Sequence, residues 1–240
     1  MSACWAIARR EWASFFRTPT GWVVTALLCA LGGAIVALTT FSPGAAASLR
    51  GFFDAAEWLL LPVVPAVSMK LLSEEHRTGT IDLIIGSPAS VPSLILGKYL
   101  GGLLTLLTML APTLVYPAVL WAVADPAPDV GPLVSGYLSL VLLGAVYLAV
   151  GLAASAAASS QTLAFLATLF VLLAWLVLPS LRVEQLPEWL DEARRAVVLR
   201  PRVRLFARGA VPISDVVFLV VAAGWALTVA AGIHAVRRVR

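Results

Sequence analysis

The feature that most constrains this chain is a series of long apolar stretches that together occupy most of its length. Crossing the hydrocarbon core of a bilayer takes about 20 residues in a helix, at about 1.5 Å per residue. Stretches that reach or approach this length run over residues 21–41, 58–72, 99–123, 133–158, 163–181 and 216–236. The second contains Pro62 and Pro65, so we extend it back to Ala55 and expect a kink. The sequence therefore predicts an all-α integral membrane protein with six transmembrane helices.

The composition leads to the same class. Hydrophobic residues make up 60% of the 240 residues and charged residues only 12%, whereas a soluble domain is about half apolar and about a quarter charged. The two cysteines, Cys4 and Cys29, lie in or beside apolar stretches and do not suggest a disulfide scaffold. The net charge of +4 comes without a long basic run in a soluble segment, so we expect no nucleic-acid partner. No repeat of fixed period is evident, and we expect a single domain over residues 1–240.

The positions of lysine and arginine predict the orientation of the chain. Basic residues precede the first span, separate the second from the third and follow the sixth; they are Arg9, Arg10, Arg17, Lys70, Arg77, Lys98, Arg237, Arg238 and Arg240. The positive-inside rule places these segments in the cytoplasm, and therefore both termini on the cytoplasmic side of the plasma (inner) membrane. The opposite side holds residues 182–215, which are themselves rich in arginine. We give more weight to the N-terminal flank because the first span usually dominates orientation.

Two segments outside the spans are amphipathic. Residues 3–16 place Trp5, Trp12 and Phe16 at helical spacing against Arg9 and Arg10, which predicts an interfacial helix within residues 1–20 that lies in contact with membrane lipid. The second segment lies within the extracytoplasmic residues 182–215. Its apolar stripe consists of Leu186, Trp189, Leu190, Ala193 and Val197.

A densely polar stretch separates the second span from the third. Within it, residues 80–85 place Ile81, Ile84 and Ile85 on one face of a short helix, and Gly86 and Pro88 then break the chain. A short cytoplasmic helix of this kind can dock in a cleft of a soluble partner and push or pull on the spans beside it. The pattern alone leaves a solvated loop as an equal alternative.

The run Glu74-Glu75-His76-Arg77-Thr78-Gly79-Thr80-Ile81-Asp82-Leu83-Ile84 resembles the signature of type-2 ABC (ATP-binding cassette) exporter permeases, the ABC-2 family. In that family the helix between spans two and three is the coupling helix, which contacts the ATPase subunit. Leu96-Gly97-Lys98-Tyr99-Leu100 is similar to the family's continuation into span three. The resemblance implies a cytoplasmic coupling segment over residues 73–92, with ATPase contacts from Glu74, Glu75, Arg77, Gly79, Thr80 and Asp82. It also implies that Arg9, Arg10, Glu11 and Trp12 belong to the family's interfacial helix.

The same resemblance implies the partners. The chain is expected to be one transmembrane half that pairs with a second permease, identical or different, and with two ATPase subunits, which bind the ATP and Mg²⁺. No cofactor, metal or catalytic residue is expected in this chain. The phosphate-binding pattern G-x-x-x-x-G-K-[ST] is missing from it, because Gly97-Lys98 is followed by Tyr99. Residues 201–215 resemble the segment before the last span in the gliding-associated GldF-like subgroup, and a NosY-like permease is the alternative within the family.

Two functions from other classes remain open. Intramembrane metalloproteases carry an E-E-x-x-x-R motif, but here Arg77 follows Glu75 too closely, and His76 and His234 are too few to form such a site. A membrane scaffold would share the hydropathy without needing a coupling segment. Asp54 and Glu57 lie at the outer mouth of the second span, where we expect the dipole of a helix N-terminus to stabilise them. The spans are rich in Leu, Val and Ala, which favours a lipid-like or polymeric substrate over a small ion.

Overall fold

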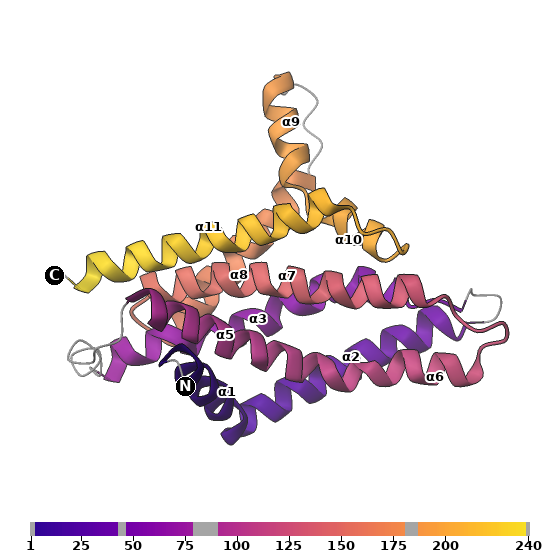
Figure 1. Cartoon of the computed structure of the whole chain (residues 1–240), viewed down its shortest axis with the longest axis horizontal. Coiled ribbons are helices and arrows are strands. Elements are labelled where there is room, and N and C mark those ends of the chain that lie inside the picture. The colour runs from indigo at the N-terminus through magenta and orange to yellow at the C-terminus, as the bar shows by residue number, and fades with distance from the viewer. Residues whose placement is uncertain (1–2, 43–46, 79–90, 181–186, 239–240) are drawn as a thin grey trace.

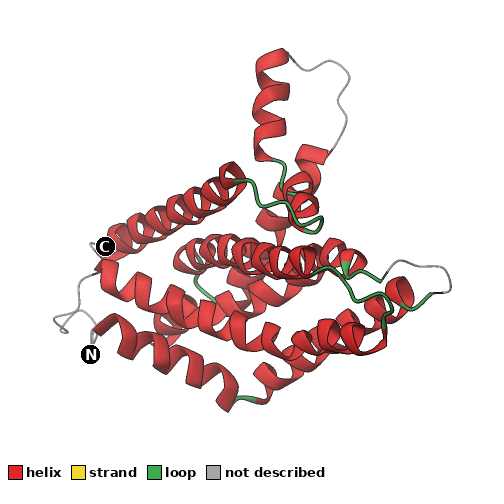
Figure 2. Ribbon diagram, turned by 45° about the vertical axis from the view of Figure 1, so that its right-hand side comes forward, coloured by secondary structure: helices red, strands yellow, loops and turns green. Residues whose placement is uncertain are grey.

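The computed structural model describes residues 3–42, 47–78, 91–180 and 187–238, and within these ranges the chain is helical and contains no strand (Figure 2). The helices of the first half are α1 (Ala3–Arg17), α2 (Pro19–Thr40), α3 (Arg50–Thr78), α5 (Val91–Leu110) and α6 (Val115–Val123). Those of the second half are α7 (Val130–Ala157), α8 (Gln161–Val177), α9 (Glu188–Val197), α10 (Arg200–Phe206) and α11 (Ile213–Arg238). The predicted all-helical class is confirmed for the described residues.

Among the residues that the structure describes, five stretches are long and apolar enough to cross a membrane, namely Pro19–Thr40, Arg50–Ser73, Pro92–Val123, Val130–Ala157 and Ile213–Val236. The third consists of α5 and α6 joined by a 3₁₀ turn over Ala111–Leu114, where Pro112 lacks the amide hydrogen that a continuous α-helix would use. The remaining predicted span forms α8, whose 17 residues reach about 26 Å, and the short 3₁₀ turn Leu178–Ser180. The predicted multi-pass membrane protein is thus confirmed, with one crossing segment shorter than the others.

Helix α7 forms the centre of the bundle. It packs against α3, α8 and α11, and its Leu140, Leu143, Tyr147 and Leu152 side chains are fully buried. Helix α3 lies beside it and remains one helix through Pro62 and Pro65. The surface of α2 and α11 is by contrast largely apolar and exposed, as expected of helices that face lipid or another membrane subunit.

The two ends of the bundle carry different elements (Figure 1). At one end α1 lies close to the end of α3 and the start of α5, and α11 also ends there, so both described ends of the chain lie at the same end of the bundle. Near the other end lie α10 and the turn into α11, where Gly209 adopts a φ of 89°, a conformation that strongly favours glycine. Helix α9 stands out from the bundle across its long axis, and its Trp189 is 68% exposed.

Candidate coupling site

The residues predicted to contact an ATPase surround the point where α3 ends. Glu74, Glu75 and Arg77 belong to the last turns of α3, which runs to Thr78. Gly79, Thr80 and Asp82 lie outside the described residues, as does the short helix predicted over residues 80–85. The structure therefore defines the two helices from which this segment emerges, α3 and α5.

A buried lysine ties three helices together at this point. Lys98 of α5 is 1% exposed, and its Nζ donates to Glu11 Oε1 of α1 at 3.2 Å and to the backbone carbonyl of Leu71 in α3. A buried ammonium group requires such partners because desolvation of an unpaired charge is very costly. Leu71 lies one helical turn before Glu74. Lys98 thus links the interfacial helix to the root of the predicted coupling segment.

This position of Lys98 differs from the sequence-based prediction. That prediction began the third span at Tyr99 and counted Lys98 among the solvent-facing basic residues. In the structure α5 begins at Val91, so Lys98 is two turns inside a helix and its charge is enclosed by α1 and α3. A lysine that far inside an apolar helix requires an acidic partner, but the sequence does not show which acid supplies it.

Two glycines allow α1 to lie directly on α5. A Cβ at Gly97 would come within 2.9 Å of the Cys4 carbonyl oxygen, and a Cβ at Gly101 within 2.7 Å of Glu11 Cβ. Real Cβ atoms do not approach other atoms this closely, so any side chain here would separate the two helices. The spacing Gly97-x-x-x-Gly101 is typical of close helix packing, and here the packed partner is α1.

The other residues predicted for the interfacial helix, Trp12, Arg9 and Arg10, differ in their contacts. Trp12 donates its indole Nε1–H to Thr108 Oγ1 of α5 at 2.9 Å, which fixes the middle of α1 on the bundle. Arg9 and Arg10 are exposed on the side of α1 away from α5 and form no ion pair within the described residues. The prediction of a helix at residues 3–16 is confirmed by α1.

A serine of α7 anchors the same part of α3. Ser155 Oγ accepts hydrogen bonds from the backbone amides of Leu72 and Ser73, at 3.2 and 3.1 Å. Ser155 is fully buried, and the adjacent turn of α7 contains Gly151, which brings the two backbones close together at Ser68. The signal in the sequence that could have indicated this contact is the small-x-x-x-small spacing from Gly151 to Ser155.

Asp54 and Glu57 of α3 have arginine partners that their positions in the sequence did not indicate. Helix α3 begins at Arg50, so Glu57 lies two turns inside it, beyond the first turn over which the helix dipole acts. The expected stabilisation of Glu57 by a helix N-terminus was therefore wrong. Glu57 is 2% exposed and its Oε2 lies 3.4 Å from Arg200 Nε, while Asp54 Oδ1 lies 3.9 Å from Arg204 Nε.

These pairs come from α10, a short helix whose arginines all face acidic partners. Its remaining arginine, Arg202, forms an ion pair with Asp215 at the start of α11, and the Arg202 guanidinium lies 4.0 Å from the ring centroid of Phe218. The arginine-rich segment that the sequence analysis assigned to the extracytoplasmic side is thus partly neutralised by carboxylates of α3 and α11. Within the described residues, no three His, Cys, Asp or Glu side chains gather as metal ligands would.

The fold and these contacts define a multi-pass helical membrane protein whose amphipathic N-terminal helix is tied to the adjacent ends of two spans. The model of a family described as ABC-2 family transporter protein matches residues 5–209. Because this match extends from α1 through α10, the chain belongs to the ABC-2 transporter family, a family of membrane transporter components. No curated protein matches the chain.

Proposed function

We propose that the chain is the permease subunit of an ATP-driven type-2 exporter, in which a partner ATPase binds the ATP and Mg²⁺. Two ATPase subunits and a second permease, identical or different, would complete the transporter. Six crossings are proposed, with α8 and its 3₁₀ extension as the fifth. An even number of crossings agrees with the position of both described chain ends at one end of the bundle (Figure 1). We propose that this end is cytoplasmic and that the membrane is the plasma (inner) membrane.

The observation that carries the proposal is the contact of Lys98 with both Glu11 and the Leu71 carbonyl. An ATPase that moves the segment between α3 and α5 would displace both flanking helices. Because Lys98 joins these helices to α1, the displacement would reach α1 as well. Ser155 would carry it further, since it holds the same turn of α3 against the central helix α7. The site is therefore suited to transmit a mechanical load rather than to bind a small molecule.

The test is stimulation of the partner ATPase by the reconstituted permease. Replacing Glu74, Glu75 and Asp82 by their amides should abolish this stimulation while the variant still inserts into the membrane, because the proposed docking contacts lose their charge. The matched control removes the acidic groups of Asp125, Glu184 and Glu192, which lie outside the coupling segment, and should keep the stimulation. Unchanged stimulation in the first variant would contradict the coupling assignment. A pull-down from native membranes should recover a protein with a phosphate-binding loop.

The orientation is tested by labelling single cysteines in a chain lacking Cys4 and Cys29. Ser14 is exposed on α1, and Ala210 is exposed in the turn between α10 and α11. Cysteines at these two positions should react with a membrane-impermeant reagent from opposite sides of the membrane, with Ser14→Cys on the cytoplasmic side. Reaction from the same side would contradict the six-span topology.

The composition of the spans bears on the class of substrate. The spans consist mainly of Leu, Val and Ala, and we propose a lipid-like or polymeric substrate, or mechanical work on such a molecule. The GldF-like subgroup stays our first choice and the NosY-like subgroup the second. An intramembrane protease or a non-transporting scaffold would be favoured instead if no ATPase accompanied the chain.

A further inference from the structure

The exposed side of α1 carries positive charge that nothing in the described structure neutralises. Arg9, Arg10 and Arg17 are exposed and form no ion pair within the described residues. The helix contains one acidic residue, Glu11, and its carboxylate is turned inward to Lys98. The local sequence Arg-Arg-Glu suggests partial compensation of charge, but the fold removes the carboxylate from the surface and leaves the arginines uncompensated.

Aromatic side chains flank these arginines. Trp5 and Trp12 of α1 are 46% and 37% exposed, and Trp22 at the start of α2 is 65% exposed. The rings of Trp12, Phe16 and Trp22 follow one another at centroid distances of 6.1 and 5.5 Å, so they form a continuous row from α1 onto the first span. Tryptophan is typical of the level of the lipid headgroups, because its ring is apolar and its N–H is polar.

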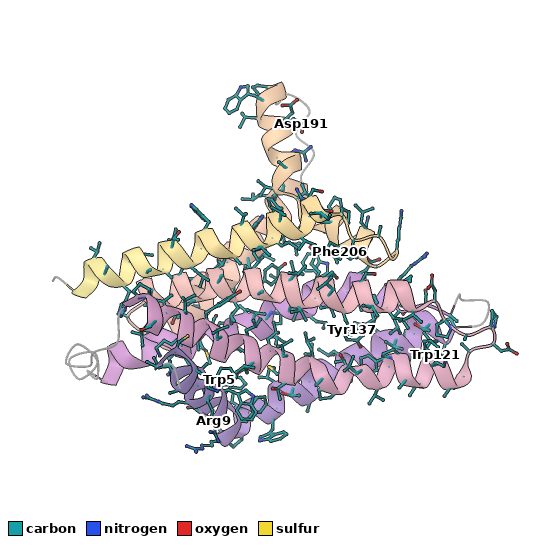
Figure 3. The ribbon with its side chains drawn as sticks, in the orientation of Figure 1. Trp5, Arg9, Trp121, Tyr137, Asp191 and Phe206 are labelled. Carbon is teal, nitrogen blue, oxygen red and sulfur yellow. The ribbon has the colours of Figure 1, made fainter. Side chains whose placement is uncertain are left out.

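Among Trp5, Trp12 and Trp22, only the indole N–H of Trp5 is available to a ligand within the residues that the structure describes. The N–H groups of Trp12 and Trp22 are used within the protein, by Thr108 Oγ1 and by the Phe16 carbonyl. The indole N–H of Trp5 donates to no acceptor in the described part of the chain. Trp5 and Arg9 lie one helical turn apart on α1, at the edge of the bundle (Figure 3). Because residues four apart lie on the same face of a helix, this face of α1 carries both a hydrogen-bond donor and a guanidinium group.

We propose that this surface, formed by Trp5, Arg9, Arg10 and Arg17, binds the phosphate groups of anionic phospholipids in the adjacent leaflet. The arginines supply charge and hydrogen bonds to phosphate, and the tryptophans set the depth of the helix at the headgroup level. The exposed aromatic row favours a lipid over a soluble anion, because a soluble anion would not require it. The proposal depends on membrane insertion but not on ATPase coupling.

The test is lipid binding to the purified full-length chain, measured by native mass spectrometry during titration with phosphatidylglycerol or phosphatidylcholine. A basic side chain near an anionic surface strengthens binding about fivefold, so the double variant Arg9→Gln, Arg10→Gln should bind phosphatidylglycerol about 25-fold more weakly. Phosphatidylcholine binding should not change. A control variant, Arg50→Gln with Arg208→Gln, removes two exposed arginines from the opposite end of the bundle and should keep phosphatidylglycerol binding close to wild type.

A charge-conserving variant separates recognition from misfolding. Arg9→Lys with Arg10→Lys should retain most of the phosphatidylglycerol binding, because it keeps both charges. Wild-type binding by the glutamine variant, or an equal loss in the lysine variant or the opposite-end control, would overturn the proposal. It would also be overturned if the glutamine variant bound lipid normally but no longer co-purified with an ATPase, since the surface would then belong to a protein interface.

Discussion

Removal of the Lys98 ammonium group tests directly whether this side chain holds α1, α3 and α5 together. In Lys98→Met the chain keeps a side chain of similar length but loses the bonds to Glu11 Oε1 and to the Leu71 carbonyl. Hydrogen bonds to charged groups contribute about 1.5–3 kcal/mol each, and breaking a buried ion pair costs about 3–5 kcal/mol. The Glu11 side chain is 17% exposed and retains some hydration, so we expect a loss near the lower end, about 3 kcal/mol of unfolding free energy.

The assay is reversible unfolding in mixed micelles, followed by tryptophan fluorescence, with Glu11→Gln completing a double-mutant cycle. Glu11→Gln alone should also cost about 3 kcal/mol, because Lys98 stays charged at 1% exposure. In the Lys98→Met background the same change should cost little, which gives a coupling energy of about 3 kcal/mol. Lys70→Met is the control: Lys70 lies 5.8 Å from the Phe15 ring centroid, and its loss should cost about 0.5 kcal/mol. Additive effects of Lys98→Met and Glu11→Gln would refute the argument.

Three further changes test the packing around this site and at the opposite end. Ser155→Ala should speed hydrogen–deuterium exchange at the two α3 amides that bond to it and cost about 1–3 kcal/mol, whereas unaltered exchange would show that these bonds contribute nothing. Gly101→Val should displace α1 and increase its cleavage by protease, while Gly224→Val, at a site with open space around the glycine, should not. Arg200→Gln leaves the buried carboxylate of Glu57 unpaired and should lower the free energy of unfolding by about 3–5 kcal/mol. Arg204→Gln breaks an ion pair that is half exposed and should cost less than about 1 kcal/mol, so equal costs would contradict the assigned burial.

The two ion pairs between α10 and α3 are buried to different extents, and this difference affects how α10 is held. Glu57 keeps one carboxylate oxygen, Oε1, without a hydrogen-bond partner in the described structure, and the nearby Tyr147 hydroxyl is likewise unpaired. Arg200 is therefore the main compensation for this buried charge, and its guanidinium also lies 5.1 Å from the ring centroid of Trp58. The attachment of α10 to α3 thus rests more on Arg200 than on Arg204.

The amino-acid sequence by itself determined the class of the protein and most of its helices. Apolar length depends on composition along the chain, so the helices α2, α3, α5–α6, α7, α8 and α11 follow from hydropathy. The pattern of α1 is also local, because an amphipathic face repeats every three or four residues. The density of polar residues between the second and third spans predicted a coupling segment, which stays a prediction. The resemblance of this stretch to known permeases indicated the family that the match over residues 5–209 confirms.

Only the tertiary structure decided which charges meet and which stay exposed. Glu11 and Lys98 are 87 positions apart, and their contact depends on the approach of α1 to α5 at Gly97 and Gly101. Local sequence cannot specify such a pair, since any acid near that end of the bundle could have served. The same packing that buries Glu11 leaves Arg9 and Arg10 exposed, so the charge of the α1 surface is a property of the fold: it is set by what the helix turns inward.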